Sequence, residues 1–231
     1  MTEHFPGFSK QTLKFLAALD QHNDREWFKA RKSEYEAFVL SPARQYVVAM
    51  GARLQQISPG IHAIPMVDKS IFRMHRDTRF SPDKRPFKTH IGIFLWEGDD
   101  DKLDCPGFYL HLEKDKLIIG GGIHIFSKPL LAAFRDAVDD EKQGRRLEKI
   151  LRAGQEYFRS GLDTDTYKRV PRGYPAEHPR ADLLKQKGVT LGETGAVPEA
   201  LHTDGAIDYV YERFEKILPL HRWLCEMKLR A

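Results

Sequence analysis

Residues 107–126 read GFYLHLEKDKLIIGGGIHIF, and this stretch decides the fold. Apolar side chains recur at every second position on both sides of the polar run EKDK, and a period of two is typical of β-strands. A short polar run between two such segments predicts a tight hairpin. We therefore predict two adjacent antiparallel strands, each with one buried face and one more polar face.

Two further strands are predicted before this hairpin. IFRMHRDTRF (71–80) and FKTHIGIFLW (87–96) alternate apolar and polar residues, and the proline-containing SPDKRP (81–86) between them is typical of a turn. Helical patterns lie on both sides of these strands. We predict a single α+β domain over residues 1–231. Its antiparallel meander has about four or more strands, at about residues 70–126, and packs with N-terminal and C-terminal helices.

Local signals predict where some of these helices begin. Asn23 or Asp24 is expected to cap one helix, and Ser41 followed by proline is expected to cap the next. Residues 161–180 are rich in Asp, Thr, Pro and Gly, so we predict a long ordered loop there.

The composition is that of an ordinary globular protein. Hydrophobic residues make up 41% of the 231 residues and charged residues 30%, which excludes collagen, coiled coil and wholesale disorder. The longest apolar run, about Ile91 to Trp96, is far shorter than a membrane helix, and no secretory pattern opens the chain. Cys105 and Cys225 form no CxxC pair and are interpreted as reduced thiols. We predict a cytoplasmic protein with no membrane partner.

The surplus of positive charge lies in one stretch, residues 68–90, which we call the basic segment. The chain holds 37 basic and 33 acidic residues, and outside the basic segment 30 of each remain. The basic residues of the segment are Lys69, Arg73, Arg76, Arg79, Lys84, Arg85 and Lys88. A concentrated cationic segment attracts anions through its local field.

Side chains alternate across a strand, so parity sorts the predicted strands into two faces. One face collects polar residues, and Gly92, Gly120 and Gly122 leave space on it. The polar residues are Arg73, His75, Asp77, Arg79, Lys88, His90, Tyr109, His111, Glu113 and His124. We interpret this face either as the floor of a polar pocket or as a solvated outer surface. Parity also places Arg76 on the apolar face, with Asp83 and Glu26 as candidate partners.

The order of residues in the basic segment resembles a known family. RMHRDTRFSPDKRPF (73–87) resembles the signature of the uncharacterised family catalogued as domain of unknown function 2461, which has an Arg-Asp-x-Arg-Phe-x-x-Asp-Lys core. NDREWF (23–28) and the GGG at 120–122 also resemble that family, so the resemblance covers the whole chain. Phe87 departs from it, because the family pattern usually has tyrosine there. The resemblance implies no established activity.

The residue types favour a site for a small phosphate- or carboxylate-bearing molecule, because arginine forks bind such groups bidentately. Arginines and lysines would contact or frame the anion while aspartates orient them. The predicted ligand-binding residues are Arg73, Arg76, Asp77, Arg79, Asp83, Lys84 and Lys88. Histidine titrates near neutral pH, so a reaction would need an acid or base from this polar face. The candidates are His75, His111, Glu113 and His124.

Other functions stay open. No HExxH, His-x-His or cysteine pair indicates a metal site, and no Gly-rich phosphate loop precedes a helix, so the sequence predicts no metal and names no cofactor. The basic segment, with its interleaved phenylalanines, also suits a nucleic-acid- or protein-binding groove. A third interpretation is a purely structural network of ion pairs. The sequence predicts neither a reaction nor an oligomeric state.

Overall fold

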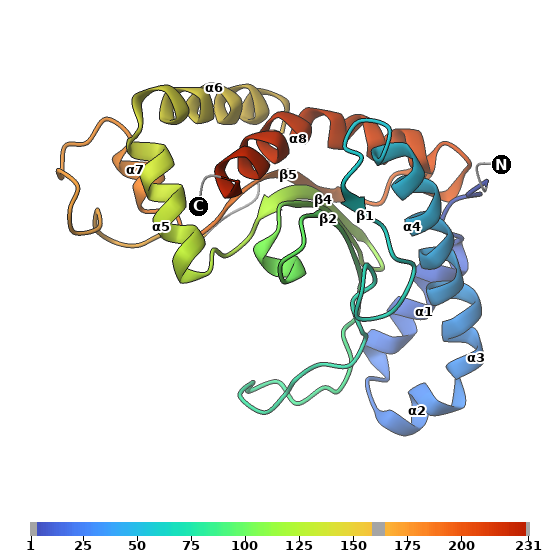
Figure 1. Cartoon of the computed structure of the whole chain (residues 1–231). Coiled ribbons are helices and arrows are strands. Elements are labelled where there is room, and N and C mark those ends of the chain that lie inside the picture. The colour runs from blue at the N-terminus through green and yellow to red at the C-terminus, as the bar shows by residue number, and fades with distance from the viewer. Residues whose placement is uncertain (1–3, 159–164, 230–231) are drawn as a thin grey trace. The chain divides into compact units, whose positions relative to one another are not determined.

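A computed structural model describes residues 4–158 and 165–229, which form an α+β fold (Figure 1). Its strands form one five-stranded antiparallel sheet in the order β1-β2-β3-β4-β5. The strands are β1 (Ile61–His62), β2 (Ile91–Glu97), β3 (Gly107–Leu112), β4 (Lys116–Ile123) and β5 (Val189–Ala196). The α-helices are α1 (Lys10–Gln21), α2 (Arg25–Ala30), α3 (Lys32–Tyr35), α4 (Ser41–Leu54), α5 (Lys128–Asp139), α6 (Glu141–Tyr157), α7 (Ala181–Leu184) and α8 (Ala206–Lys228). The short helices are η1 (Glu36–Leu40), η2 (Lys102–Asp104) and η3 (Glu199–His202).

The hairpin predicted from residues 107–126 is confirmed as β3 and β4. Glu113 N donates to the carbonyl of Lys116 at 2.8 Å and closes the tight turn between the two strands. Phe108, Leu110 and Leu112 are buried, as the alternation predicted. The fold class predicted from the sequence is therefore correct.

The strand predicted at residues 71–80 is wrong. Ile71 and His75 form isolated antiparallel bridges to Ile93 and Phe87, with main-chain hydrogen bonds beside them, but these bridges do not join into a continuous strand. Polar residues after His75 bond to close neighbours in sequence instead of facing a partner strand. Asp77, for example, accepts a hydrogen bond from the main-chain N of Arg79, the kind of local bond that makes turns.

Two strands of the sheet lie outside the range of about residues 70–126 that the sequence predicted. β1 comes before this range, and β5 begins more than sixty residues after its end. The sequence VTLGETGA of β5 contains two glycines, and glycine weakens a strand pattern. β5 also explains one glycine of the GGG run. Gly122 has a φ of 129°, and a β-carbon there would collide with the main chain of Val189. The space at Gly122 therefore admits β5, whereas the sequence had suggested a ligand.

Several helices begin where the sequence predicts. The side chain of Asp24 caps α2 by accepting a hydrogen bond from Trp27 N at 2.8 Å. Ser41 does not cap α4, because a π-helical turn over Glu36–Leu40 already runs into that helix. Of the predicted loop, residues 165–180 contain no helix or strand, and residues 161–164 lie outside the described residues. In the described part of the chain, no helix has both the length and the apolar character needed to cross a bilayer.

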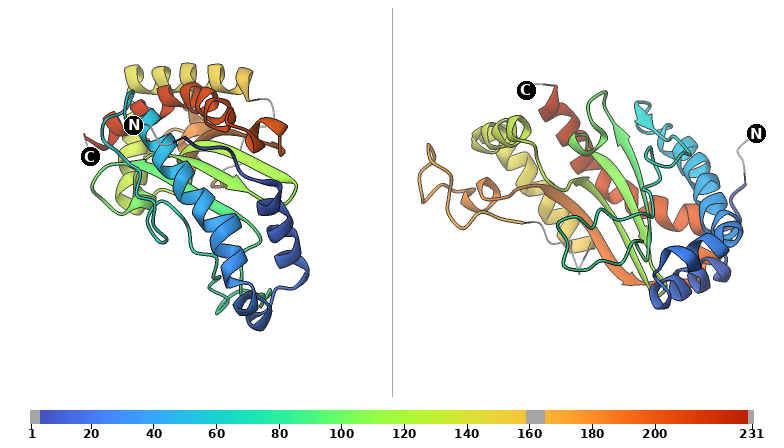
Figure 2. Two further views of the ribbon diagram at one scale, coloured as in Figure 1. Left: turned by 90° about the vertical axis from the view of Figure 1, so that its right-hand side faces the viewer. Right: turned by 90° about the horizontal axis from the view of Figure 1, so that it is seen from below.

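The chain divides into two compact units, each built from three segments. The first unit contains Met1–Leu95, Tyr109–Ile119 and Gly195–Glu212, and the second contains Trp96–Phe108, Gly120–Thr194 and Arg213–Ala231. In the first unit α4 packs beside β1 (Figure 1). In the second unit α5 and α6 lie side by side (Figure 2). The single domain predicted over residues 1–231 stays a prediction.

Candidate functional site

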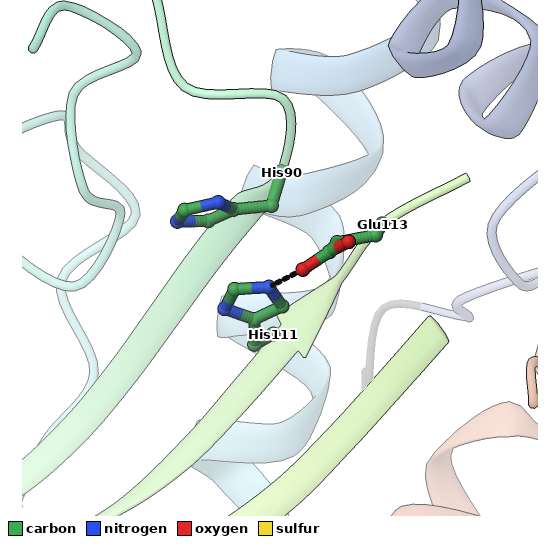
Figure 3. Close-up of side chains that lie close together, drawn as sticks. All are labelled: His90, His111 and Glu113. Carbon is green, nitrogen blue, oxygen red and sulfur yellow. Dashed lines mark hydrogen bonds and ion pairs between the residues drawn. The ribbon is translucent and has the colours of Figure 1, made fainter. Parts of the chain in front are cut away.

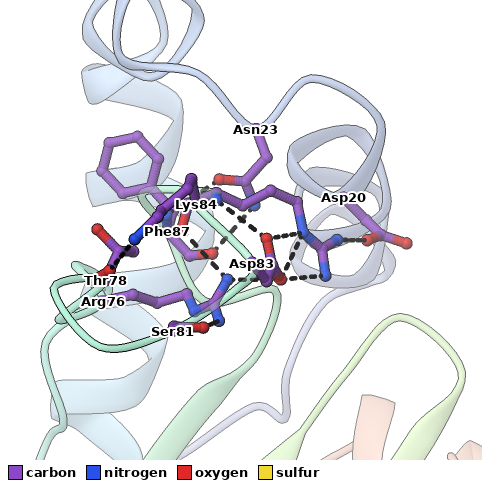
Figure 4. Close-up of polar contacts among 9 residues, drawn as sticks. Asp20, Asn23, Arg76, Thr78, Ser81, Asp83, Lys84 and Phe87 are labelled. Atoms are coloured by element: carbon purple, nitrogen blue, oxygen red, sulfur yellow. Dashed lines mark hydrogen bonds and ion pairs between the residues drawn. The ribbon is translucent and has the colours of Figure 1, made fainter.

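The carboxylate of Asp83 holds two arginines of the basic segment (Figure 4). Its Oδ2 lies 2.7 Å from Nη1 of Arg76 and 2.9 Å from Nη2 of Arg85, which also reaches Asp20 of α1 at 3.2 Å. The bonds from Arg85 and then Arg76 hold the pKa of Asp83 well below its usual range. Of the two predicted partners for Arg76, Asp83 is therefore the observed one. The Arg76 side chain is only 24% exposed, so this pair is partly shielded from water.

The remaining charges of the turn bond to near neighbours as well. Arg79 holds Asp77 in a two-pronged ion pair, with Nη2 to Oδ2 at 2.7 Å and Nε to Oδ1 at 3.0 Å. The hydrogen bonds from Arg79 lower the pKa of Asp77 to about 2. Lys84 donates to the carbonyl of Thr78 at 2.9 Å. These contacts have the pattern expected of an ion-pair network that orders a loop.

Asn23 anchors the end of the basic segment to the N-terminal helices (Figure 4). Its Nδ2 donates to the carbonyl of Phe87 and its Oδ1 accepts from the Phe87 N, both at 3.0 Å. The buried Phe87 ring stacks on Phe28 with ring centroids 4.2 Å apart. His75, a predicted acid or base, packs its ring against Phe87 at 4.8 Å and is exposed. It therefore contacts aromatic rings rather than the other polar candidates.

Four residues predicted to share the polar face do meet there, and we call them the histidine cluster: His90, Tyr109, His111 and Glu113. Figure 3 shows His90, His111 and Glu113. His111 Nε2 lies 2.8 Å from Glu113 Oε1, and His111 Nδ1 lies 3.1 Å from the Tyr109 hydroxyl. The His90 ring stacks on His111 with centroids 3.9 Å apart. His90 comes from the residue before β2, and the others come from β3 and its end. Strand parity thus correctly predicted this grouping.

The electrostatics of the histidine cluster fix which atoms carry protons. Partial burial opposes ionisation of Glu113, but bonds from Lys116 and His111 outweigh it and lower the pKa of Glu113. Burial, then the charge of Glu113, raises the pKa of Tyr109 to about 12, so its hydroxyl keeps its proton. Tyr109 therefore donates to His111 Nδ1, and His111 Nε2–H donates to Glu113. Burial, then the charge of His111, lowers the pKa of His90 to about 4, so its ring is neutral at pH 7.

Two predicted ligand residues, Arg73 and Lys88, differ from the rest of the basic segment, and we call them the cationic pair. Among the residues that the structure describes, no carboxylate lies within ion-pair distance of either. Partial burial, then the charge of Arg73, lowers the pKa of Lys88. The Lys88 ammonium lies 5.3 Å from the centre of the Phe72 ring. That ring in turn contacts Tyr109 edge-on with centroids 6.2 Å apart, so the pair adjoins the histidine cluster.

A glycine lies between the cationic pair and the histidine cluster. A β-carbon at Gly92 would come within 3.0 Å of the Tyr109 hydroxyl and 3.1 Å of the Phe72 ring. Both distances are tighter than ordinary van der Waals contact, so a larger residue would displace the hydroxyl that holds His111. Gly92 was predicted to leave space on the polar face, and the side chains of Tyr109 and Phe72 occupy that space.

Two further residues differ from expectation. His124, a predicted acid or base, lies one residue past the end of β4 in the second unit, and its side chain is exposed. The sequence reasoning missed Lys116, whose ammonium lies 2.7 Å from Glu113 Oε1 across the hairpin. The signal was available, because opposite charges on either side of a tight turn face each other.

A second cluster of titratable groups lies in the second unit, and the sequence reasoning missed it. His221 of α8 is fully buried, and its Nε2 lies 2.7 Å from Glu97 Oε2 and 3.6 Å from Cys225 Sγ. Burial, then the charge of Glu97, raises the pKa of Cys225 to about 12, so Cys225 stays a thiol. The signal was the spacing of His221 and Cys225, four residues apart on one helix and therefore on one face.

Together these features define an α+β protein with an antiparallel sheet that carries a stacked histidine pair beside two cations without a carboxylate at ion-pair distance in the described chain. The family model described as "Conserved hypothetical protein (DUF2461)" matches residues 11–223. The chain therefore belongs to this family, as the resemblance implied. No curated protein and no solved structure matches the chain.

Proposed function

We propose that the protein binds a small phosphate- or carboxylate-bearing molecule at the cationic pair. The observation that carries this proposal is the partly buried Lys88, which adjoins Arg73 and has no carboxylate within ion-pair distance in the described chain, while the charge of Asp68 acts on it from farther away. Two like charges close together, one of them partly buried, raise the free energy of the folded protein, and a bound anion lowers it. The guanidinium fork of Arg73 suits both oxygens of a phosphate or carboxylate.

In this proposal the other predicted ligand residues order the loop and do not contact the anion. Arg76, Asp77, Arg79, Asp83 and Lys84 bond to one another or to main-chain carbonyls, so their charges are neutralised locally. They order the loop that precedes Lys88. The proposed site is therefore narrower than the set expected from the sequence.

The histidine cluster supplies proton chemistry beside the proposed anion. Tyr109 donates to His111, and Glu113 orients the same imidazole, which is the arrangement of a general base and its orienting carboxylate. We place any catalytic step at Tyr109 and His111, with the anion held by the cationic pair. Two free cysteines in the described chain agree with the cytoplasmic location, which remains part of the proposal.

Titration calorimetry with inorganic phosphate at low salt tests the anion site. Lys88→Ala should weaken phosphate binding by about tenfold or more, because a hydrogen bond to a charged group contributes about 1.5–3 kcal/mol. Lys84→Ala is the matched control, since Lys84 contacts a carbonyl of its own loop, and it should change the affinity by less than about twofold. Equal losses in both variants would mean diffuse attraction by the whole basic segment and would overturn the proposal.

A nucleic-acid role is a second candidate, favoured by one exposed aromatic residue. Phe80 is 92% exposed, and the Arg79 guanidinium lies 5.7 Å from its ring centre, an arrangement on which a base can stack. A labelled single-stranded oligonucleotide distinguishes the two candidates. Binding that falls steeply with salt and is lost in Phe80→Ala would favour nucleic acid, whereas phosphate binding sensitive only to Arg73 and Lys88 favours the small anion.

A further inference from the structure

We propose that the histidine cluster also binds a divalent first-row transition-metal ion through His90, His111 and Glu113. One donor atom from each of these residues lies within 4.8 Å of the other two (Figure 3). Metal bonds of about 2.0–2.2 Å to nitrogen and oxygen place neighbouring donors about 3–3.5 Å apart. His111 Nε2 and Glu113 Oε1 are 2.8 Å apart, so these two donors need to separate only slightly, while the His90 ring has to turn toward them. Two imidazoles and one carboxylate suit ions such as Zn²⁺ and Fe²⁺.

The orientation of His111 favours this site, because a ligating histidine is usually fixed by a partner on its other ring nitrogen. The Tyr109 hydroxyl lies 3.1 Å from His111 Nδ1 and can accept a hydrogen bond there as well as donate one. When an ion takes the place of the proton on Nε2, the imidazole carries its proton on Nδ1, and Nδ1–H donates a hydrogen bond to the Tyr109 oxygen. The ring therefore stays neutral and hydrogen-bonded in both states.

His90 completes the set of ligands. Its ring is partly buried against His111, and no hydrogen-bond partner for its nitrogens occurs among the described residues. A ring held in this way by stacking alone is available to an ion on the His111 side. Lys116 opposes binding, because its ammonium shares Glu113 Oε1. The ion must displace that contact or use the other carboxylate oxygen.

The second cluster, Glu97–His221–Cys225, offers donors at similar separations but lacks this support. His221 Nδ1 is buried without a partner, so an ion on Nε2 would leave an Nδ1–H group buried and unsatisfied. This contrast favours the histidine cluster over the sulfur-containing one. The metal site does not depend on the proposed anion site, since the ligands of the two sites are different residues.

Titration of the full chain with Co²⁺ in phosphate-free buffer tests the metal site, because cobalt reports its ligands in the absorption spectrum. We expect one ion per chain with visible d–d bands and no near-ultraviolet sulfur-to-cobalt band. His90→Ala should weaken binding by about 100-fold or more, and Tyr109→Phe by about 10–100-fold as an outer partner. The matched control His124→Ala should leave the affinity unchanged. Lys116→Met should tighten binding severalfold, which a variant that merely loosens the fold would not do.

Three results would overturn the metal proposal. They are no cobalt binding at millimolar concentration, equal affinity in His90→Ala and the unaltered chain, and a sulfur-to-cobalt band that Cys225→Ser removes. The last result would place the ion at the second cluster. Cobalt binding without phosphate binding, or the reverse, separates the fate of this proposal from that of the anion site.

Discussion

The basic segment and the histidine cluster are both rich in titratable groups, but their charges are arranged in opposite ways. In the turn of the basic segment each guanidinium contacts a carboxylate within a few residues, as Arg79 contacts Asp77. At the sheet face the imidazoles are neutral and stacked, and the neighbouring Lys88 has no carboxylate partner in the described chain. A high density of arginine therefore indicates order in the loop, whereas the proposed anion site lies at the cation beside the sheet that lacks an ion-pair partner.

The largest expected effect is a loss of stability when the contact that anchors the basic segment to the N-terminal helices is removed. Phe87→Ala should lower the free energy of unfolding by about 3 kcal/mol, because it empties a buried site against Phe28. Urea unfolding followed by circular dichroism measures the loss. Phe80→Ala is the matched control, and its 92% exposed ring should contribute nothing measurable. Similar stability in the two variants would contradict a loop anchored by Phe87.

The second prediction concerns the histidine cluster and the dependence of protein stability on pH. The pKa of His90 is about 4 in the folded chain and near 6.5 when unfolded, so between these values the unfolded state binds the extra proton. Stability should therefore fall as the pH is lowered from 6.5 to 4, by up to about 2 kcal/mol at a partly exposed ring. Nuclear magnetic resonance titration of His90, folded and in urea, measures both pKa values. A folded value near 6.5 would contradict stacking against His111.

The smallest expected effect separates two ion pairs within the basic segment. Arg76→Ala should lower stability by about 1 kcal/mol, because it removes a partly buried pair and a bond to the Arg85 carbonyl. Arg79→Ala removes an exposed pair, whose charges water and salt already screen, and should leave the melting temperature unchanged. Phosphate affinity should be the same in both variants. If Arg76→Ala binds phosphate more weakly while its stability is unchanged, Arg76 contacts the anion after all.

The sequence predicts the structure correctly where alternating apolar and polar residues belong to strands that are neighbours along the chain. The β3–β4 hairpin needs only a period of two and a tight polar turn, and both lie within twenty residues. The same parity places Tyr109, His111 and Glu113 on one face, and His90, the residue before β2, joins them by stacking on His111. The hairpin and its polar face can be predicted because strand alternation and a tight turn are set by residues close together in sequence.

The errors arise where partners are distant in sequence or bonds are local. Residues 71–80 alternate like a strand, but Asp77 and Arg79 satisfy each other, so the alternation does not reflect a sheet. β5 pairs with β4 from far along the chain, and nothing in VTLGETGA identifies that partner. The split between the cationic pair and the neutralised arginines also needed three-dimensional contacts, since every arginine of the segment looks alike in sequence.

The two hydrogen bonds between the Asn23 side chain and the Phe87 main chain also cover an edge of the short ladder in the basic segment. Residues 74–76 pair with residues 86–88 on one side, through bonds from Arg76 N to Pro86 and from Lys88 N to Met74. On the other side the main-chain N–H and C=O of Phe87 would be open to a strand from another molecule, but one amide side chain occupies both. Asn23 thus protects this short ladder from edge-to-edge aggregation, a task that most proteins give to charge, proline or a covering helix.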